Sequence, residues 1–156
     1  MMKLAKYLKV ENIYITDTCK DTGSFYGEFS QFLKERGLID DVKKVKRLFI
    51  KREGIQSTGI GKGVATPHIF SSEFSDFLLA AAMIRCGLDF KAPDNRDVQL
   101  VFLIMSDDRD IGLHLKTLAH IARLTGGTDI IGGLKNTLSA AEIYAMLMEK
   151  EKAILN

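Results

Sequence analysis

The three histidines, His68, His114 and His120, are the side chains best suited to chemistry, and their placement is informative. His68 follows Pro67 after the short apolar run 64–65. Proline fixes the backbone and removes an N–H donor, so we expect this strand to be an edge strand or to end here. His68 would then lie at the margin of a sheet, where a neutral imidazole can react. A satisfied, half-buried structural histidine is an equal alternative for this residue taken alone.

His114 falls near the start of a predicted helix over residues 112–125, where free N–H groups and the helix dipole favour a nearby anion. His120 lies six positions further on, about 240° around the helix axis, so the two rings cannot face one target. This spacing argues against a metal site built on the pair, and the sequence contains no HExxH, CxxC or carboxylate cluster. We therefore expect His120 to be structural or to lie on the surface.

A glycine-rich segment covers residues 57–63 and reads STGIGKG. It lacks the glycine spacing of a Walker A loop, and it does not match GxGxxG, so a nucleotide site is not supported. Two interpretations remain for this backbone. Its N–H groups could line a small anion site at Thr58, Gly59, Gly61 and Gly63, or the segment could be only a tight turn.

Hydrophobic periodicity indicates the elements that must position these residues. Helices are predicted over residues 22–36, from Asp40 or Asp41 to about 51, over 112–125, and from Ser139 to Met148. Gly37 fits a C-terminal cap, Asp110 an N-terminal cap, and Ser139 with Glu142 a capping box. The 112–125 helix should end at residues 126–127, which are both glycine.

Short or nearly continuous apolar runs at residues 64–65, 78–84 and 98–105 predict strands, and the two longer ones should be covered on both faces. Helices and buried strands therefore alternate along the chain. We predict an α/β fold, with one domain over residues 1–156 and a mixed, parallel and antiparallel sheet of roughly five strands flanked by helices.

Composition excludes several classes of function. The 22 basic and 20 acidic residues leave a net charge of +2, so no overall field favours nucleic acid or anionic lipid. A basic run at residues 43–47 is interpreted as the solvated face of a helix, with a docking patch for an acidic partner as the second interpretation. Cys19 and Cys86 lack CxxC spacing, which fits a reducing cytoplasm. With no apolar stretch near 20 residues and no signal-peptide pattern, we expect a cytoplasmic protein without direct membrane insertion.

The segment from Arg52 to His68 contains Arg-Glu, then Thr-Gly-Ile-Gly, then a small apolar pair close to Pro-His. This order closely resembles the signature of the fructose/mannitol-type enzyme IIA domains of the bacterial sugar phosphotransferase system. The resemblance continues through residues 87–90, the apolar run 98–104 and the segment 114–119, and it extends from about Leu4 to Met148.

The resemblance implies a phosphotransferase that acts as a phosphohistidine carrier without a cofactor. His68 would accept phosphate from an HPr-type phosphocarrier protein and pass it to an enzyme IIB, which serves a membrane-bound IIC. His114 and Arg52 match the other active-site residues of the family, whereas the role of Glu53 is left open. Arg52 would supply a planar fork of donors to the phosphoryl oxygens, although its alternative is an ordinary cation at a helix end.

Departures from the pattern at Thr66, Ile69 and the segment 70–77 border the transfer site and bear on the choice of partner or sugar. One alternative function is a regulatory module of the same fold, as in nitrogen-related IIA-like proteins, which signals by phosphorylation-dependent partner binding. A more distant alternative is an unrelated glycine-loop anion or nucleotide binder.

Overall fold

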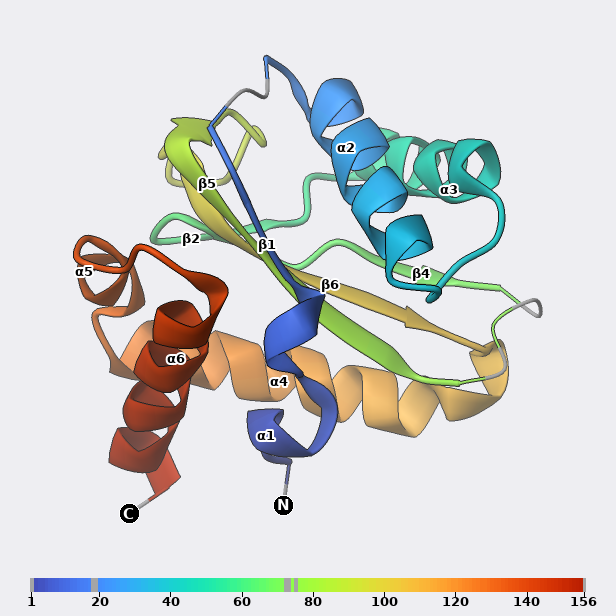
Figure 1. Ribbon diagram of the computed structural model, residues 1–156. Coiled ribbons are helices and arrows are strands. Elements are labelled where there is room, and N and C mark those ends of the chain that lie inside the picture. The colour runs from blue at the N-terminus through green and yellow to red at the C-terminus, as the bar shows by residue number, and fades with distance from the viewer. Residues whose placement is uncertain (1, 18–19, 72–73, 75, 156) are drawn as a thin grey trace.

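In the computed structural model of the protein, which describes residues 2–17, 20–71, 74 and 76–155, two long apolar strands form the centre of a sheet (Figure 1). They are β5 (Leu78–Leu88) and β6 (Val98–Ser106), and they pair in antiparallel fashion. Alternate residues along each strand pack into two different core clusters, with Ala80 and Ala82 in one and Leu79 and Ala81 in the other. The prediction that both strands are covered on both faces is confirmed.

Shorter strands complete the sheet on either side. β1 (Ile13–Thr16) pairs parallel with β5, whereas β3 (Val64–Ala65) and β4 (His68–Phe70) both pair parallel with β6. β2 (Gly59–Gly61) pairs antiparallel with β3, so the order is β1-β5-β6-β3-β2 with β4 also on β6. The predicted mixed sheet of roughly five strands is confirmed, with six strands in the described residues.

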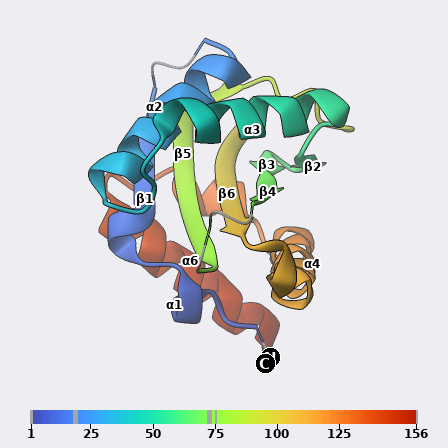
Figure 2. The same ribbon diagram turned by 90° about the vertical axis from the view of Figure 1, so that its right-hand side faces the viewer.

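Helices cover both faces of the sheet, which gives three layers (Figures 1 and 2). On one face lie α2 (Thr22–Glu35) and α3 (Val42–Ile55), whose apolar side chains form one core cluster with the sheet. The other face is covered by α1 (Leu4–Tyr7), α4 (Ile111–Gly127), α5 (Ile130–Leu134) and α6 (Ala140–Leu155). Two single-turn 3₁₀ helices, η1 (Val10–Asn12) and η2 (Asp108–Asp110), precede β1 and α4. This arrangement is the single α/β domain architecture expected from the sequence.

Local capping residues set most helix ends. Gly37 adopts φ +73° after α2, and the Asp41 side chain accepts a hydrogen bond from Lys44 N at the start of α3. Asp110 precedes α4 as predicted, but its side chain makes no capping hydrogen bond. At α6, Ser139 Oγ accepts from Glu142 N, and the helix continues seven residues beyond the predicted end at Met148, to Leu155.

The basic run on α3 is a solvated helix face, because Lys43 and Arg47 are exposed while Val45 and Phe49 are buried. Cys86 is an exposed free cysteine, and Cys19 lies outside the described residues, as do residues 72, 73 and 75 of the unusual segment 70–77. Within the described ranges, no helix has both the length and the apolar character to cross a membrane.

Candidate functional site

His68 is the first residue of β4, at a position where the sheet can be reached from both helical layers. The Pro67 carbonyl accepts a hydrogen bond from Ile104 N, and His68 is then in register with Ile104 on β6. In the described part of the chain β4 pairs only with β6. His68 therefore begins a new strand, β4, and does not lie at the end of β3. Its predicted place at a sheet margin is correct.

The ring of His68 is half-buried, and its Nδ1 lies 2.8 Å from the carbonyl oxygen of Thr66. A carbonyl oxygen can only accept, so this contact places the proton on Nδ1 and leaves the lone pair on Nε2. Burial lowers the pKa of His68 below its ordinary value, an effect to which the charge of Arg52 adds. His68 is therefore a neutral imidazole with a nucleophilic Nε2 near pH 7.

His114 lies in the first turn of α4, on the side of the sheet that His68 faces, and it is only 1% exposed. Its ring centroid lies 5.2 Å from that of His68, with the two planes at 73°. Its Nδ1 lies 2.9 Å from Ser106 Oγ, whereas its Nε2 is the one buried side-chain nitrogen or oxygen without a hydrogen-bond partner among the described residues. Burial and the neighbouring His68 lower the pKa of His114 to about 4, so this ring is also neutral.

An exposed apolar surface adjoins the two histidines. Phe70, two positions after His68 on β4, lies with its ring centroid 4.1 Å from that of His114 and is 39% exposed. Because alternate residues of a strand share a face, Phe70 and His68 are both on the α4 side of the sheet. Ile111 and Leu115 are exposed one helical turn apart at the start of α4. Sequence patterns did not mark this surface, because it combines a strand with a helix about 40 residues further along the chain.

Arg52 lies in the last turn of α3, close enough to His68 for its charge to act there. Its charge acts on the pKa of His68, and its Nη1 donates to the carbonyl of Gln56 at 2.8 Å. The helix-end contact considered from the sequence is thus present. It uses one of the five guanidinium N–H groups, so donors remain for an anion beside His68.

Glu53, whose role the sequence left open, anchors the segment that leads to His68. Its carboxylate accepts hydrogen bonds from the Tyr26 hydroxyl and, at 2.7 Å each, from the backbone N–H and the hydroxyl of Thr58. The Thr58 carbonyl in turn accepts from Thr66 N at 2.9 Å, and the Thr66 carbonyl holds Nδ1 of His68. A continuous series of hydrogen bonds therefore connects the buried Tyr26 to the His68 imidazole.

The same bonds bear on the glycine-rich segment. Beyond Thr58 N, the backbone N–H of Gly59 donates to Ser57 Oγ and that of Lys62 donates to Asp94. Gly61 and Gly63 have φ +93° and +82°, which are left-handed conformations suited to the hairpin between β2 and β3. These contacts favour the tight turn over the anion site, because three backbone donors of the segment, two of them at predicted anion-site residues, already have internal acceptors.

His120 lies away from this site and is buried. Its Nε2 is 2.7 Å from Glu151 Oε2 on α6, and the same oxygen accepts from Leu4 N at 2.7 Å. Through Glu151, His120 connects α4 to α6 and α1. Its role is therefore structural, and it does not lie on the surface. As the helical spacing predicted, His114 and His120 face different targets.

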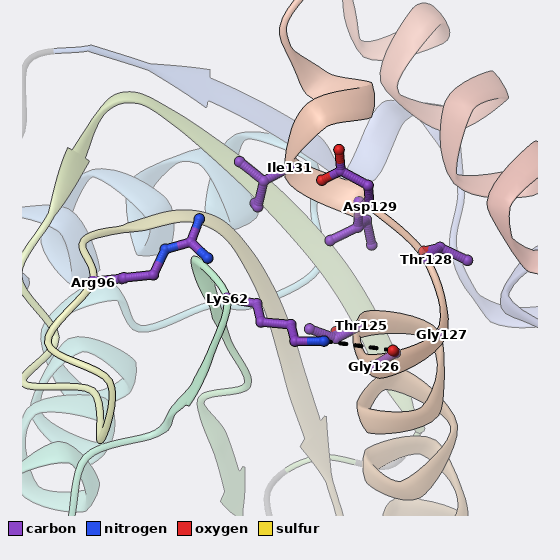
Figure 3. A pocket seen from close by; sticks show the side chains of 9 residues that line it. Lys62, Arg96, Thr125, Gly126, Gly127, Thr128, Asp129 and Ile131 are labelled. Carbon is purple, nitrogen blue, oxygen red and sulfur yellow. Dashed lines mark hydrogen bonds between the residues drawn. The ribbon is translucent and has the colours of Figure 1, made fainter.

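A cavity of about 390 Å³ lies beside the hairpin, at the other end of α4 from His114 (Figure 3). Lys62 and Arg96 extend toward it from one side and Asp129 from the other, and Lys62 Nζ lies 3.5 Å from the Gly126 carbonyl. None of the site residues predicted as catalytic lines this cavity. The described residues also contain no group of three or more histidine, cysteine or carboxylate side chains placed to hold a metal.

The chain is similar to known proteins over nearly its whole length. The family described as "Phosphoenolpyruvate-dependent sugar phosphotransferase system, EIIA 2" matches residues 6–150. The fructose-specific EIIABC component of the phosphotransferase system from Bacillus subtilis is 25% identical over 151 residues. That alignment covers 97% of this chain and 24% of the relative, so the chain spans about a quarter of that protein's length.

Two solved structures share the fold. The nitrogen regulatory protein IIA-Ntr from Neisseria meningitidis has a TM-score of 0.81 and 27% identity, covering 92% of this chain and 98% of that one. The enzyme IIA of the Escherichia coli mannitol system, solved in complex with phosphorylated enzyme IIB, has a TM-score of 0.71 and 18% identity over 91% of this chain and 99% of that one.

Proposed function

The chain belongs to the phosphoenolpyruvate-dependent sugar phosphotransferase system EIIA 2 family, and from this premise we propose that it carries a phosphoryl group on Nε2 of His68. Domains of this family are phosphotransfer components. The observation that carries the proposal is the 2.8 Å contact between His68 Nδ1 and the Thr66 carbonyl, in a ring that burial keeps neutral. Together they supply a lone pair on Nε2 without a separate general base.

Phosphoryl transfer to His68 needs one bond to form and one to break. The Nε2 lone pair attacks the phosphorus of a phosphohistidine on the donor, and the electron pair of the broken N–P bond stays on the donor's imidazole. Nδ1 of His68 keeps its proton throughout, and the Thr66 carbonyl stabilises the positive charge that the ring gains. Onward transfer is the same step with His68 as the donor.

Arg52 and His114 are proposed to stabilise the charge on the transferring group. That charge is spread over three equatorial oxygens, so the main contributions are positioning and hydrogen-bond donation. Arg52 offers the guanidinium donors that its contact with Gln56 leaves available. His114 offers Nε2, which is buried and has no partner among the described residues. Thr58 and the glycines contribute by shaping the hairpin.

We propose an HPr-type phosphocarrier protein as donor and an enzyme IIB, serving a membrane IIC, as acceptor. The mannitol enzyme IIA solved with its phosphorylated IIB provides the precedent for the acceptor. The exposed Phe70, Ile111 and Leu115 offer an apolar contact surface beside His68 and His114. A regulatory role is the second candidate, and the likeness to IIA-Ntr favours it. In that role phosphorylated His68 would control binding to a target protein.

The proposal is tested by incubating the protein with enzyme I, HPr and labelled phosphoenolpyruvate. We expect the wild type to become labelled and His68→Ala to remain unlabelled. The control is His120→Gln, which keeps a side-chain N–H for Glu151 and should be labelled like the wild type. Label on His68→Ala would refute the assignment.

The two candidate roles differ in the fate of the phosphoryl group on His68. For a carrier, adding an enzyme IIB from a fructose or mannitol system should remove label from His68 and transfer it to IIB. A regulatory module should instead keep its label when IIB is added.

A further inference from the structure

Ser106, the last residue of β6, makes a contact with His114 that nothing in the sequence pattern marks. Its hydroxyl oxygen lies 2.9 Å from His114 Nδ1, and both residues are buried, with 0% and 1% of their surface exposed. Within the described ranges, this is the one hydrogen bond of either side chain. His114 Nε2 has none.

The direction of this hydrogen bond decides what His114 can do. If the Ser106 hydroxyl donates, Nδ1 is the acceptor and the ring proton is on Nε2. If Nδ1 donates, Nε2 carries a lone pair. Phosphoryl oxygens only accept hydrogen bonds, so the first tautomer would stabilise a phosphoryl group on His68 and the second would repel it. A cationic ring could donate from both nitrogens, but burial lowers the pKa of His114 to about 4, so the tautomer matters at neutral pH.

The surroundings of Ser106 favour donation to His114. Its backbone carbonyl is taken up by Ser71 N, and the strand register fixes it opposite Phe70. The neighbouring carboxylate of Asp107 is directed at the backbone N–H and the guanidinium of Arg109. In the part of the chain that the structure describes, His114 Nδ1 is thus the acceptor that the Ser106 hydroxyl reaches. If His114 Nδ1 donated instead, the hydroxyl proton of Ser106 would be buried without an acceptor, which costs free energy.

We propose that Ser106 is a positioning residue of the phosphoryl-transfer site: its hydroxyl donates to His114 Nδ1 and keeps the proton on Nε2, ready for a phosphoryl group on His68. The inference rests on the proposed role of His68 as the phosphate carrier. In this role Ser106 does not contact the phosphoryl group itself. It determines which nitrogen of His114 carries the proton that the phosphoryl group would accept. Ser106, His114 and His68 form a second series of contacts that reaches the site from β6 and α4.

The tautomer can be measured directly by ¹⁵N NMR of the imidazole nitrogens in the unphosphorylated protein. We expect wild-type His114 to show a protonated Nε2 and an unprotonated Nδ1. Ser106→Ala should shift both nitrogens toward exchange-averaged values, and Ser106→Thr, which keeps a hydroxyl, should retain the wild-type pattern. Ser30→Ala is the matched control, because Ser30 is a buried serine on α2, across the sheet. A protonated Nδ1 in wild-type His114, or an unchanged pattern in Ser106→Ala, would overturn the proposal.

Transfer kinetics provide the second measurement. Ser106→Ala should slow phosphorylation by HPr at least roughly tenfold, because a misdirected donor stabilises the transferring group poorly. Ser106→Thr should restore much of the rate, and Ser30→Ala should leave it unchanged. A Ser106→Ala rate equal to that of the wild type contradicts the positioning role. Absence of label on the wild type would instead refute the role of His68, while the tautomer of His114 is tested independently of it.

Discussion

The imidazoles of His68 and His114 lie close enough, at 5.2 Å between centroids, that a proton on one opposes a proton on the other. Burial lowers the pKa of both, that of His114 to about 4. Only neutral His68 has a free lone pair on Nε2, so its phosphorylation should be lost as the pH falls through this lowered pKa. We predict that the rate halves below about pH 6.5, the ordinary midpoint of a free histidine.

NMR titration of the two rings, together with phosphorylation of His68 by a small-molecule phosphoryl donor at each pH, tests this prediction. Both rings should titrate below the ordinary value, with His114 the lower of the two. A small donor avoids the titration of histidines on a partner protein. A rate that halves at or above about pH 6.5 would contradict it.

The sequence pointed to the side chains of the candidate site but not to the atoms that orient them. His68, Arg52 and His114 were found through the family motif; the structure brings the rings of His68 and His114 together and places Arg52 where its charge acts on His68. Which nitrogen of His68 keeps its lone pair depends on the Thr66 carbonyl, whose direction is set by the connection between β3 and β4. Ser106 was missed because only the end of β6 and the start of α4 together bring it to His114.

Among the elements, the connection between α3 and the β2–β3 hairpin depends on Glu53, which holds Tyr26 and Thr58. We predict that Glu53→Ala lowers the free energy of unfolding by about 2 to 4 kcal/mol, because it leaves the buried donors of Thr58 without an acceptor. It should also weaken the preference of His68 for a protonated Nδ1, since Thr58 positions Thr66.

Urea unfolding and ¹⁵N NMR of His68 measure these two effects of Glu53→Ala. Glu35→Ala is the control, because Glu35 is exposed at the end of α2 and should change stability by less than about 0.5 kcal/mol. Tyr26→Phe removes one of the three hydrogen bonds and should cost less than Glu53→Ala. An unaltered His68 tautomer in a destabilised Glu53→Ala protein would limit Glu53 to a role in stability.

The elements that sequence reasoning predicted are those whose signals are local. The helices α2, α3, α4 and α6 have an apolar stripe and capping residues within their own segments, so their positions follow from periodicity. Strands β1, β2 and β4 have only three or four residues, too few for a period to show. The glycine pattern of β2 predicted a loop. It is a strand because β3 pairs with it. Glycine is needed at position 59, because a Cβ added there would lie 2.7 Å from the Ala92 Cβ.

Across the whole molecule, the sheet edge at β4 brings together groups from both helical layers. Arg52 and Glu53 come from α3 on one face, and His114 comes from α4 on the other. The nearly continuous apolar runs of β5 and β6 predict two covered faces but not which helix covers which face. The approach of Arg52 and His114 to β4 from opposite layers is therefore a consequence of the three-layer topology.

A buried polar link at Glu151 holds the α4 layer together without contacting His68 or His114. Its removal therefore tests stability apart from phosphoryl transfer. Glu151 on α6 is 4% exposed and accepts from His120 on α4 and from Leu4 N on α1. Glu151→Ala leaves both donors buried without this acceptor, so we predict a loss of about 2 to 4 kcal/mol in the free energy of unfolding. Glu149→Ala, an exposed position on the same helix, should change it by less than about 0.5 kcal/mol.

Urea unfolding of the two variants measures the difference, and equal stabilities would refute the structural role of the link. The transfer rate adds a second criterion, because His114 lies near the start of α4 and its contact with Ser106 does not involve Glu151. At a temperature where Glu151→Ala is folded in the absence of urea, its phosphorylation by HPr should match the wild-type rate per folded molecule. A slowed transfer in folded Glu151→Ala would mean that the position of α4 against α6 also sets the position of His114, so that the start and the middle of α4 act as one unit.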